Sequence, residues 1–139
     1  KEGFAELLDI GAQGIEYPMF SVATHRALLR ERPAALRAFM TAYVDAIAYL
    51  NKHRAETLET MARYTRRDDP EVLNSTYDLY TARYIVRVPY PTLGGISTIL
   101  DAVRDSEPRA GEVAPADLID DHFVRELDES GYIRRLYDQ

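Results

Sequence analysis

One long amphipathic pattern in the first half of the chain constrains its fold more than any other feature. Between positions 33 and 50, apolar side chains recur every three or four residues, which is the spacing of one face of an α-helix. The members of this stripe are Leu36, Phe39, Met40, Tyr43, Val44, Ile47 and Leu50. The more polar or small-residue faces between them carry Arg37, Thr41, Asp45 and Ala48. Pro33 suits a first helical turn, where its missing N–H costs nothing, so we predict a helix that starts there and buries the stripe.

Shorter helical patterns lie on either side of this one. We expect a brief helical turn around Leu28 and Leu29, and a further helix over about 54–64. Asp69 and Pro70 have the character of an N-cap and a first-turn proline, and the helix that they start should end before position 89. Thr92 is a suitable cap for another helix. The apolar face of that helix would comprise Ile96, Ile99, Leu100 and Val103.

The last part of the chain divides at a proline and a glycine. Residues 107–114 contain Pro108 and Gly111 and are expected to form a loop. Pro115 opens the final helical region, for which Gly131 is the expected C-cap. Residues 132–137 then form a closing amphipathic turn or two.

The first 24 residues of the chain have a pattern typical of strands rather than of helices. Residues 4–10 form a short apolar run followed by glycines, and residues 17–24 are rich in β-formers. Pro18 favours a strand start or a sheet edge, because proline cannot donate to a ladder. The fold class is therefore mainly α, with one or two strands followed by a series of helices. Since an unpaired strand needs a sheet partner, we expect the rest of its sheet to lie upstream of Lys1.

Composition excludes several classes of protein. The formal net charge is −6 and the sequence pI is about 5.1, whereas a nucleic-acid binder usually has a basic patch or a high pI. The chain has no cysteine, which excludes disulfides, thiolate zinc sites and a cysteine nucleophile. No run approaches the roughly 20 apolar residues of a membrane span. The sequence starts at Lys1 without Met and without the apolar h-region of a signal peptide, and we expect that this start is a cut rather than a natural beginning.

No residue pattern in the chain requires catalytic or metal chemistry. The three histidines have no ligand spacing, and Asp120 and Asp121 beside His122 would point in different directions on a helix. No serine lies in a Gly-x-Ser-x-Gly elbow. The pair Gly94 and Gly95 lacks the lysine of a phosphate-binding loop. We therefore expect no enzyme activity, no metal and no cofactor.

Two places remain as candidates for contact with a small ligand. Thr92 begins a helix whose free N–H groups could face an anion, although Gly94 and Gly95 are explained as well by a close approach at that helix start. Tyr17 precedes a proline in a loop and could present its ring to a cleft. Met19 belongs to the same segment and completes the candidate set of Tyr17, Met19 and Thr92.

The order of several short motifs resembles the C-terminal part of the substrate-binding proteins of ABC importers, of the nitrate/sulfonate/taurine type. The motifs span essentially the whole chain, and the last is the most specific. They are Leu7-Leu8-Asp9 with Tyr17-Pro18, Thr24-His25-Arg26, residues 32–40, residues 69–73, residues 89–92 with Gly95-Ile96, and residues 123–133.

The resemblance implies a periplasmic-binding-protein type II fold, in which two α/β lobes close on a solute. Residues 1–24 would supply strands of the second lobe and the crossing between lobes, and residues 25–139 a helical region that packs on the first lobe. The implied function is to capture an anionic or polar organic solute and deliver it to an ABC permease subunit, at a periplasmic or extracellular membrane-associated location. Nitrate, sulfonates, taurine and pyrimidine precursors all remain open.

Two alternatives remain beside that resemblance. The first is a stand-alone helical protein-interaction domain without a transport role, which would need an exposed apolar groove and should fold well alone. The second concerns assembly: strands and helix faces left exposed in this chain could pair with a second copy to form a dimer.

Overall fold

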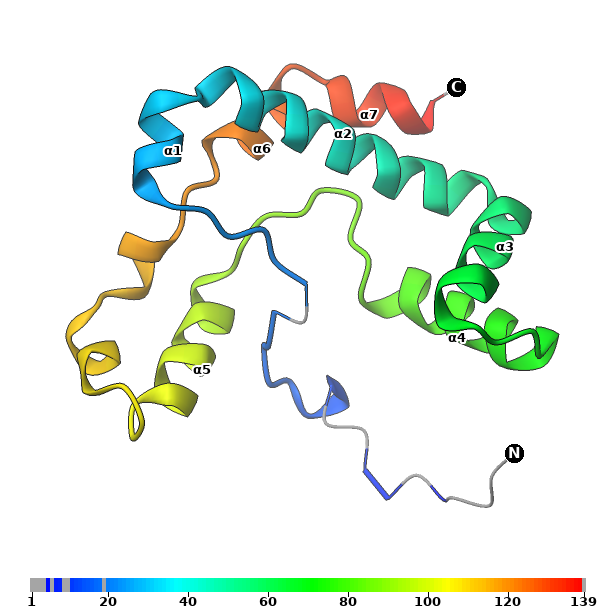
Figure 1. Ribbon diagram of the computed structural model, residues 1–139, viewed down its shortest axis with the longest axis horizontal. Helices are drawn as coiled ribbons and strands as arrows, with labels where there is room; N and C mark the ends of the chain where they lie inside the picture. The colour runs from blue at the N-terminus through cyan, green and yellow to red at the C-terminus, as the bar shows by residue number, and fades with distance from the viewer. Residues whose placement is uncertain (1–4, 6, 9–10, 19, 139) are drawn as a thin grey trace. The chain divides into compact units, whose positions relative to one another are not determined.

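A computed structural model describes residues 5, 7–8, 11–18 and 20–138 of the chain. Its elements are η1 (Gly11–Gln13), α1 (Arg26–Glu31), α2 (Pro33–Lys52), α3 (Arg54–Thr65), α4 (Pro70–Arg83), α5 (Leu93–Val103), η2 (Pro108–Glu112), η3 (Pro115–Leu118), α6 (His122–Glu129) and α7 (Tyr132–Tyr137). The described residues are mainly helical (Figure 1), which confirms the expected mainly α class.

The chain divides into two compact units, and each is discontinuous in sequence. Unit 1 comprises residues 1–23 and 91–121 and holds η1, α5, η2 and η3. Unit 2 comprises residues 24–90 and 122–139 and holds α1 to α4, α6 and α7.

The strand expected over 17–24 is not formed, so that prediction is wrong. Tyr17, Pro18 and residues 20–24 contain no strand, because a strand exists only through ladder bonds to a neighbour and no described segment pairs with this one. Of the earlier run over 4–10, only Ala5, Leu7 and Leu8 are described, and these three are not in a strand either.

The predicted helix starts are confirmed where local chemistry decides them. Pro33 and Pro70 occupy the first turns of α2 and α4. The Asp69 carboxylate accepts hydrogen bonds from the backbone N–H groups of Glu71 and Val72, at 3.0 and 3.3 Å. Gly131, with φ 72°, turns the chain between α6 and α7. The loop expected over 107–114 is more ordered than predicted, because it contains η2.

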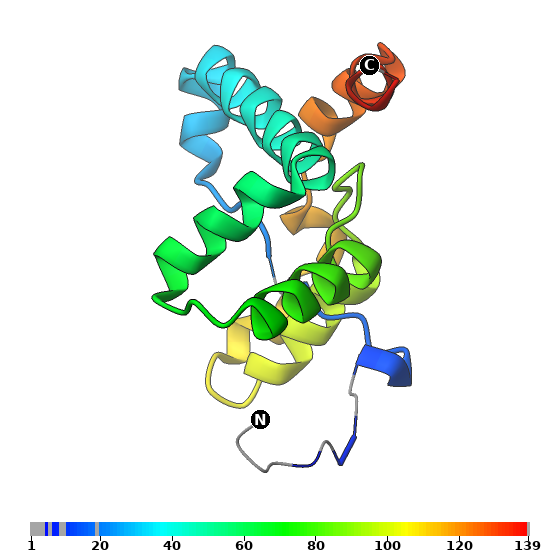
Figure 2. The same cartoon turned by 90° about the vertical axis from the view of Figure 1, so that its right-hand side faces the viewer.

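The core of unit 2 forms where α2 packs against α6 and α7. Val44, Leu127 and Ile133 are its buried centre. Partly buried apolar side chains surround them, namely Met40, Val88, Tyr132, Leu136 and Tyr137. After a sharp bend at His53, α3 packs on α4 as a second helical pair (Figures 1 and 2). On that side, Leu73 and Tyr77 are buried.

Two residues of α2 differ from the sequence expectation. Phe39, expected in the buried stripe, has 50% of its surface exposed, whereas Ala48, expected on a polar or small-residue face, is only 4% exposed. Successive helical residues are about 100° apart, so Ala48 lies almost over Val44 while Phe39 is turned well away from it. The α6 and α7 helices therefore cover only one edge of a wide apolar stripe.

Polar contacts between distant residues reinforce unit 2. The Tyr132 hydroxyl donates to Asp45 at 2.8 Å, and the Lys52 ammonium donates to the Leu136 carbonyl at 3.0 Å. The Arg37 guanidinium makes a two-pronged contact with the Glu126 carboxylate, with its closest N–O distance at 3.0 Å. Each of these contacts joins α2 to one of the last two helices.

Candidate functional site

The most distinctive local arrangement in unit 1 is the junction where the opening segment meets the start of α5. Thr92 caps α5: its backbone is extended and its side-chain hydroxyl oxygen accepts a hydrogen bond from the Gly95 N–H at 3.1 Å. Pro91 favours this arrangement, because the residue before a proline is biased to extended geometry and the chain cannot enter α5 early. The predicted cap is therefore confirmed.

Gly95 is buried because the opening segment lies directly against it. A Cβ atom placed on Gly95 would be 2.9 Å from Thr92 Oγ1 and 3.1 Å from Pro18 Cδ. Real Cβ contacts are almost never this short on both sides, so only glycine fits without a shift of its neighbours. The close approach expected at this glycine pair is confirmed, and Pro18 is what approaches.

The Glu16 carboxylate lies against the other glycine of the pair. A Cβ atom on Gly94 would be 2.6 Å from Glu16 Oε2. Gly94 belongs to the first turn of α5, where the helix dipole presents its positive end. A carboxylate of the chain itself thus lies beside the first turn of α5, although among the described residues no hydrogen bond joins it to the N–H groups of that turn.

Of the three candidate ligand residues, Tyr17 and Thr92 belong to segments that meet, and Met19 lies outside the described residues. Tyr17 lies between Glu16 and Pro18, so its segment meets the Thr92 cap at one junction although the two are far apart in the chain. The Tyr17 side chain is 59% exposed. Sequence reasoning missed Glu16, although a carboxylate one residue before Tyr17-Pro18 was a visible signal.

Shifted pKa values occur away from this junction and have structural causes. The hydrogen bond to Asp45 is the main reason that the pKa of Tyr132 is raised, with partial burial adding to it. Burial is the largest cause of the raised pKa of Tyr90, whose hydroxyl also donates to Asp128 at 3.0 Å. Arg54 lowers the pKa of Asp78 through a side-chain hydrogen bond between α3 and α4.

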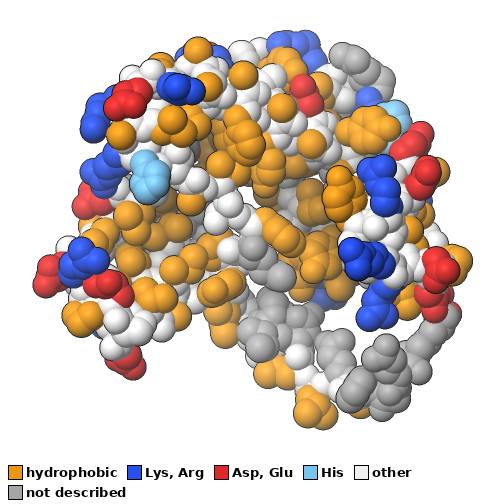
Figure 3. Space-filling view, viewed as in Figure 1, with side chains coloured by type: hydrophobic (Ala, Val, Ile, Leu, Met, Phe, Trp, Pro, Cys, Tyr) orange, Lys and Arg blue, Asp and Glu red, His pale blue; other side chains and the backbone are white. Residues whose placement is uncertain are grey.

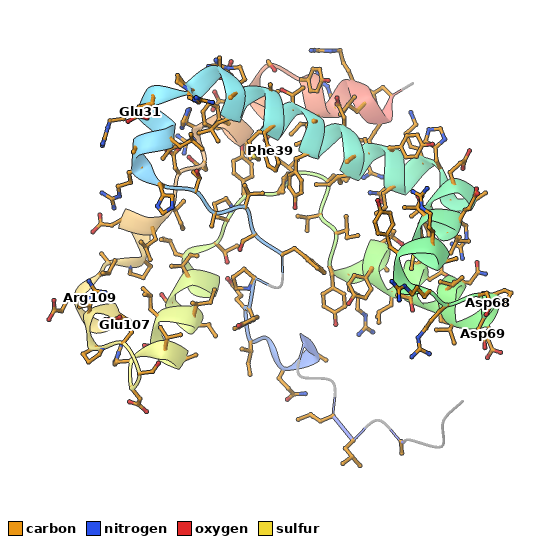
Figure 4. All side chains as sticks on the ribbon, viewed as in Figure 1. Glu31, Phe39, Asp68, Asp69, Glu107 and Arg109 are labelled. Carbon is orange, nitrogen blue, oxygen red and sulfur yellow. The ribbon has the colours of Figure 1, made fainter. Side chains whose placement is uncertain are left out.

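An ion pair in unit 1 likewise has a shifted pKa with a structural cause. Glu107 and Arg109 lie side by side after α5 (Figure 4), and the guanidinium lowers the pKa of the carboxyl group through hydrogen bonds. The Glu107 carboxylate also accepts from the Arg109 backbone N–H at 3.4 Å and so caps η2. These contacts hold elements together and need no catalytic explanation.

The part of the chain that the structure describes has neither a metal-binding cluster nor a membrane-spanning helix. No three His, Asp or Glu side chains there gather as a set of metal ligands. His122 instead packs its ring on Phe123, with ring centroids 3.7 Å apart. None of the helices in that part combines the length and the apolar character needed to cross a membrane.

Unit 2 carries a second surface of interest along α2. Phe39 projects from this helix and stacks on Tyr43, with ring centroids 6.3 Å apart and planes inclined by 8° (Figure 4). Figure 3 shows hydrophobic side chains reaching the surface in this part of the view. Tyr49, further along α2, is 51% exposed. The face formed by Phe39 and Tyr43 is a feature of unit 2 that a protein partner could use.

Comparisons of the chain with family models, with curated proteins and with solved structures find no match.

Proposed function

We propose that this chain is part of the solute-binding component of an ABC importer, as its motifs suggest by resemblance. The type II binding-protein fold, the delivery of solute to a permease subunit and the periplasmic or extracellular membrane-associated location belong to the same proposal. The solute is a small anionic or polar organic molecule. The protein binds and releases it without chemical change.

The observation that carries this proposal is the junction at the start of α5. Two motifs of the resemblance, Tyr17-Pro18 and Thr92 with Gly95, are separated by more than half of the chain and yet lie against each other through Pro18 and Gly95. The Tyr17 ring is exposed there beside a capped helix start. An exposed aromatic ring is the kind of group that fixes a small polar solute.

A second support is the open backbone of the segment before α1. Among the described residues, no hydrogen bond involves Ser21, Val22 or Ala23, and the Val22 side chain is 46% exposed. Backbone N–H and C=O groups are normally paired unless water reaches them. Such a segment is suited to join a sheet supplied from elsewhere, as the crossing between two lobes would require.

The test is thermal unfolding of this chain and of the complete product of its gene, each with nitrate, taurine, an alkanesulfonate, bicarbonate and a pyrimidine. A solute that binds only the folded state adds about 2.7 kcal/mol of stability at a hundredfold excess over its Kd. Tyr17→Ala should weaken binding about tenfold, the equivalent of about 1.4 kcal/mol. Tyr64→Ala is the matched control, because Tyr64 is 77% exposed and lies in unit 2.

Two outcomes of this unfolding experiment decide whether the proposal holds. Stabilisation of the complete product by one solute, reduced by Tyr17→Ala and unchanged by Tyr64→Ala, supports the proposal. If no solute of the panel shifts the melting temperature of either protein, solute binding of this class is refuted.

The alternative is a stand-alone helical protein-interaction domain, and the exposed Phe39–Tyr43 stack favours it. Aromatic side chains are enriched at protein interfaces, and the same face could pair two copies of this chain. Light scattering across a concentration series of the wild type and Phe39→Ala tests the dimer. A monomer at all concentrations would exclude pairing through this face.

A further inference from the structure

The opening segment packs unusually closely on the first turn of α5 for a contact made without hydrogen bonds. Glu16 and Pro18 approach Gly94 and Gly95 to within the space that a Cβ atom would need. Both glycines face this segment, and Gly95 is buried beneath it. The two small residues therefore form a gap in the first turn of α5 that this segment fills.

Nothing but packing and charge holds the segment in that gap. Among the described residues, no hydrogen bond or ion pair involves Glu16 or Pro18. The side chains of Ile15 and Tyr17 are 52% and 59% exposed, so they add little buried area. Segments with few buried contacts and no hydrogen bonds open at a low free energy relative to the rest of a fold.

The charge of Glu16 favours the seated arrangement. The start of α5 presents the positive end of its dipole, and the first turn contains no acidic residue of its own. Thr92 accepts the hydrogen bond of the Gly95 N–H. The Glu16 carboxylate lies against Gly94 in the same turn, so the positive end of the helix dipole attracts its charge.

We propose that residues Gly14–Pro18 act as a strap that alternates between a seated state on the first turn of α5 and a released state. The pair Gly94 and Gly95 is the seat, and the Glu16 carboxylate biases the strap toward it. In the seated state Pro18 covers Gly95 and the carboxylate stands over Gly94. In the released state the first turn of α5 is open. This device requires no solute, so its test does not depend on the proposed function.

Cross-linking between introduced cysteines tests the seated state, since the chain has no native cysteine to interfere. The test pair is Glu16→Cys with Gly94→Cys, treated with a short bis-maleimide, which adds one cysteine thiol to each of its two ends. The control pair is Glu16→Cys with Gly111→Cys, because Gly111 is in the same unit but has only Arg104 near its Cβ position. We expect the test pair to cross-link about tenfold faster, through its higher effective concentration. Equal rates would overturn the seated state.

Gly95→Ala tests the seat itself. The added methyl group would come within 2.9 Å of Thr92 Oγ1 and 3.1 Å of Pro18 Cδ. It should therefore displace the strap and slow cross-linking of the test pair at least severalfold. Gly111→Ala is the control, because its Cβ would make contacts no shorter than 3.7 Å. Circular dichroism checks that α5 persists, which is expected because alanine favours helix over glycine. If Gly95→Ala leaves the rate unchanged in a folded protein, the glycine seat is refuted.

Proteolysis after Glu16 provides a second readout with the native carboxylate in place. A protease specific for glutamate needs an unfolded stretch around the cleaved bond, so it samples the released state. Cleavage between Glu16 and Tyr17 should be faster in Gly95→Ala than in the wild type and unchanged in Gly111→Ala. Equal cleavage in all three proteins would show that the strap has no seated state to lose.

Discussion

The two units of the chain are stabilised in different ways. Unit 2 has a buried centre at Val44, Leu127 and Ile133 and several side-chain hydrogen bonds between distant helices. In unit 1, Gly95 and Ala110 are the buried residues among those that the structure describes, and caps and close approach replace a large core. We infer that unit 2 provides stability, whereas unit 1 provides the adaptable surface at the start of α5.

The two units also differ in their content of charged residues. Unit 1 contains 3 Lys and Arg against 11 Asp and Glu, and unit 2 contains 14 against 12, which together make the 17 and 23 of the whole chain. Unit 1 therefore carries a formal charge of −8 (3 minus 11) and unit 2 one of +2 (14 minus 12), which sum to the −6 of the chain. Like charges repel and oppose compaction, which adds to the expectation that unit 1 is the less stable of the two.

The strongest test of this contrast is truncation in the core of unit 2. Ile133 is 2% exposed, so Ile133→Ala should lower the free energy of unfolding by about 2–5 kcal/mol, through lost burial and the cavity left behind. Urea denaturation followed by circular dichroism measures this. Leu79→Ala, at a position 42% exposed, is the control and should change stability far less. A loss below about 1 kcal/mol for Ile133→Ala would break the contrast between the units.

Matched helix caps sharpen the comparison, because each unit has one. Asp69→Ala removes the cap of α4 and should cost about 1 kcal/mol of global stability. Thr92→Ala removes the cap of α5 and should act locally, with faster hydrogen exchange at the Gly95 amide. Hydrogen exchange resolved by residue separates the two effects. If Thr92→Ala lowers the midpoint of global unfolding as much as Asp69→Ala does, the units are not independent in stability.

A residue with left-handed backbone geometry in unit 2 offers a stabilising change. Arg66 ends α3 with φ 55° and ψ 37°, a conformation that costs an ordinary residue roughly 1 kcal/mol. Arg66→Gly should therefore raise the free energy of unfolding by about that amount. Arg63→Gly, in the last turn of the same helix, should lower it. Denaturation midpoints of the two variants decide this, and equal shifts in the same direction would contradict the argument.

The smallest expected effect is a dependence of stability on pH at the α3–α4 pair. The hydrogen bond from Arg54 lowers the pKa of Asp78 in the folded state. The stabilisation is thus present above the unfolded pKa of about 4 and is lost as pH falls through the folded value. Both groups are exposed, so the effect is small. Unfolding from pH 7 to pH 2 should show a weaker acid dependence for Asp78→Asn than for the wild type.

Local chemistry made part of this structure predictable. The starts of α2, α4 and α5 follow from Pro33, Asp69 and Thr92, because proline and capping side chains act within one turn. The burial of Ala48 and the exposure of Phe39 could not be predicted, because they depend on which edge of α2 the last two helices cover. The expected strand over 17–24 failed for a related reason, since a strand requires a partner that local sequence does not supply.

The candidate site shows the same limit. The glycine pair at positions 94 and 95 predicted a close approach, but its spacing could not identify Pro18 and Glu16 as the groups that approach. A contact between residues so far apart in the chain leaves no periodic trace in either segment. Tyr17 and Thr92 were selected for separate reasons, and the structure brings their segments together at one junction.

The discontinuity of unit 2 has a consequence for the order of folding. Val44 packs with Leu127 and Ile133, so the core cannot close until α6 and α7 have left the ribosome. Until then α2 carries a bare apolar stripe, and such transiently exposed surface promotes aggregation. Long-range closure of this kind also slows folding relative to other helical proteins. We therefore expect nascent chains that stop before α6 to depend on chaperones, although they already contain the longest helix of the protein.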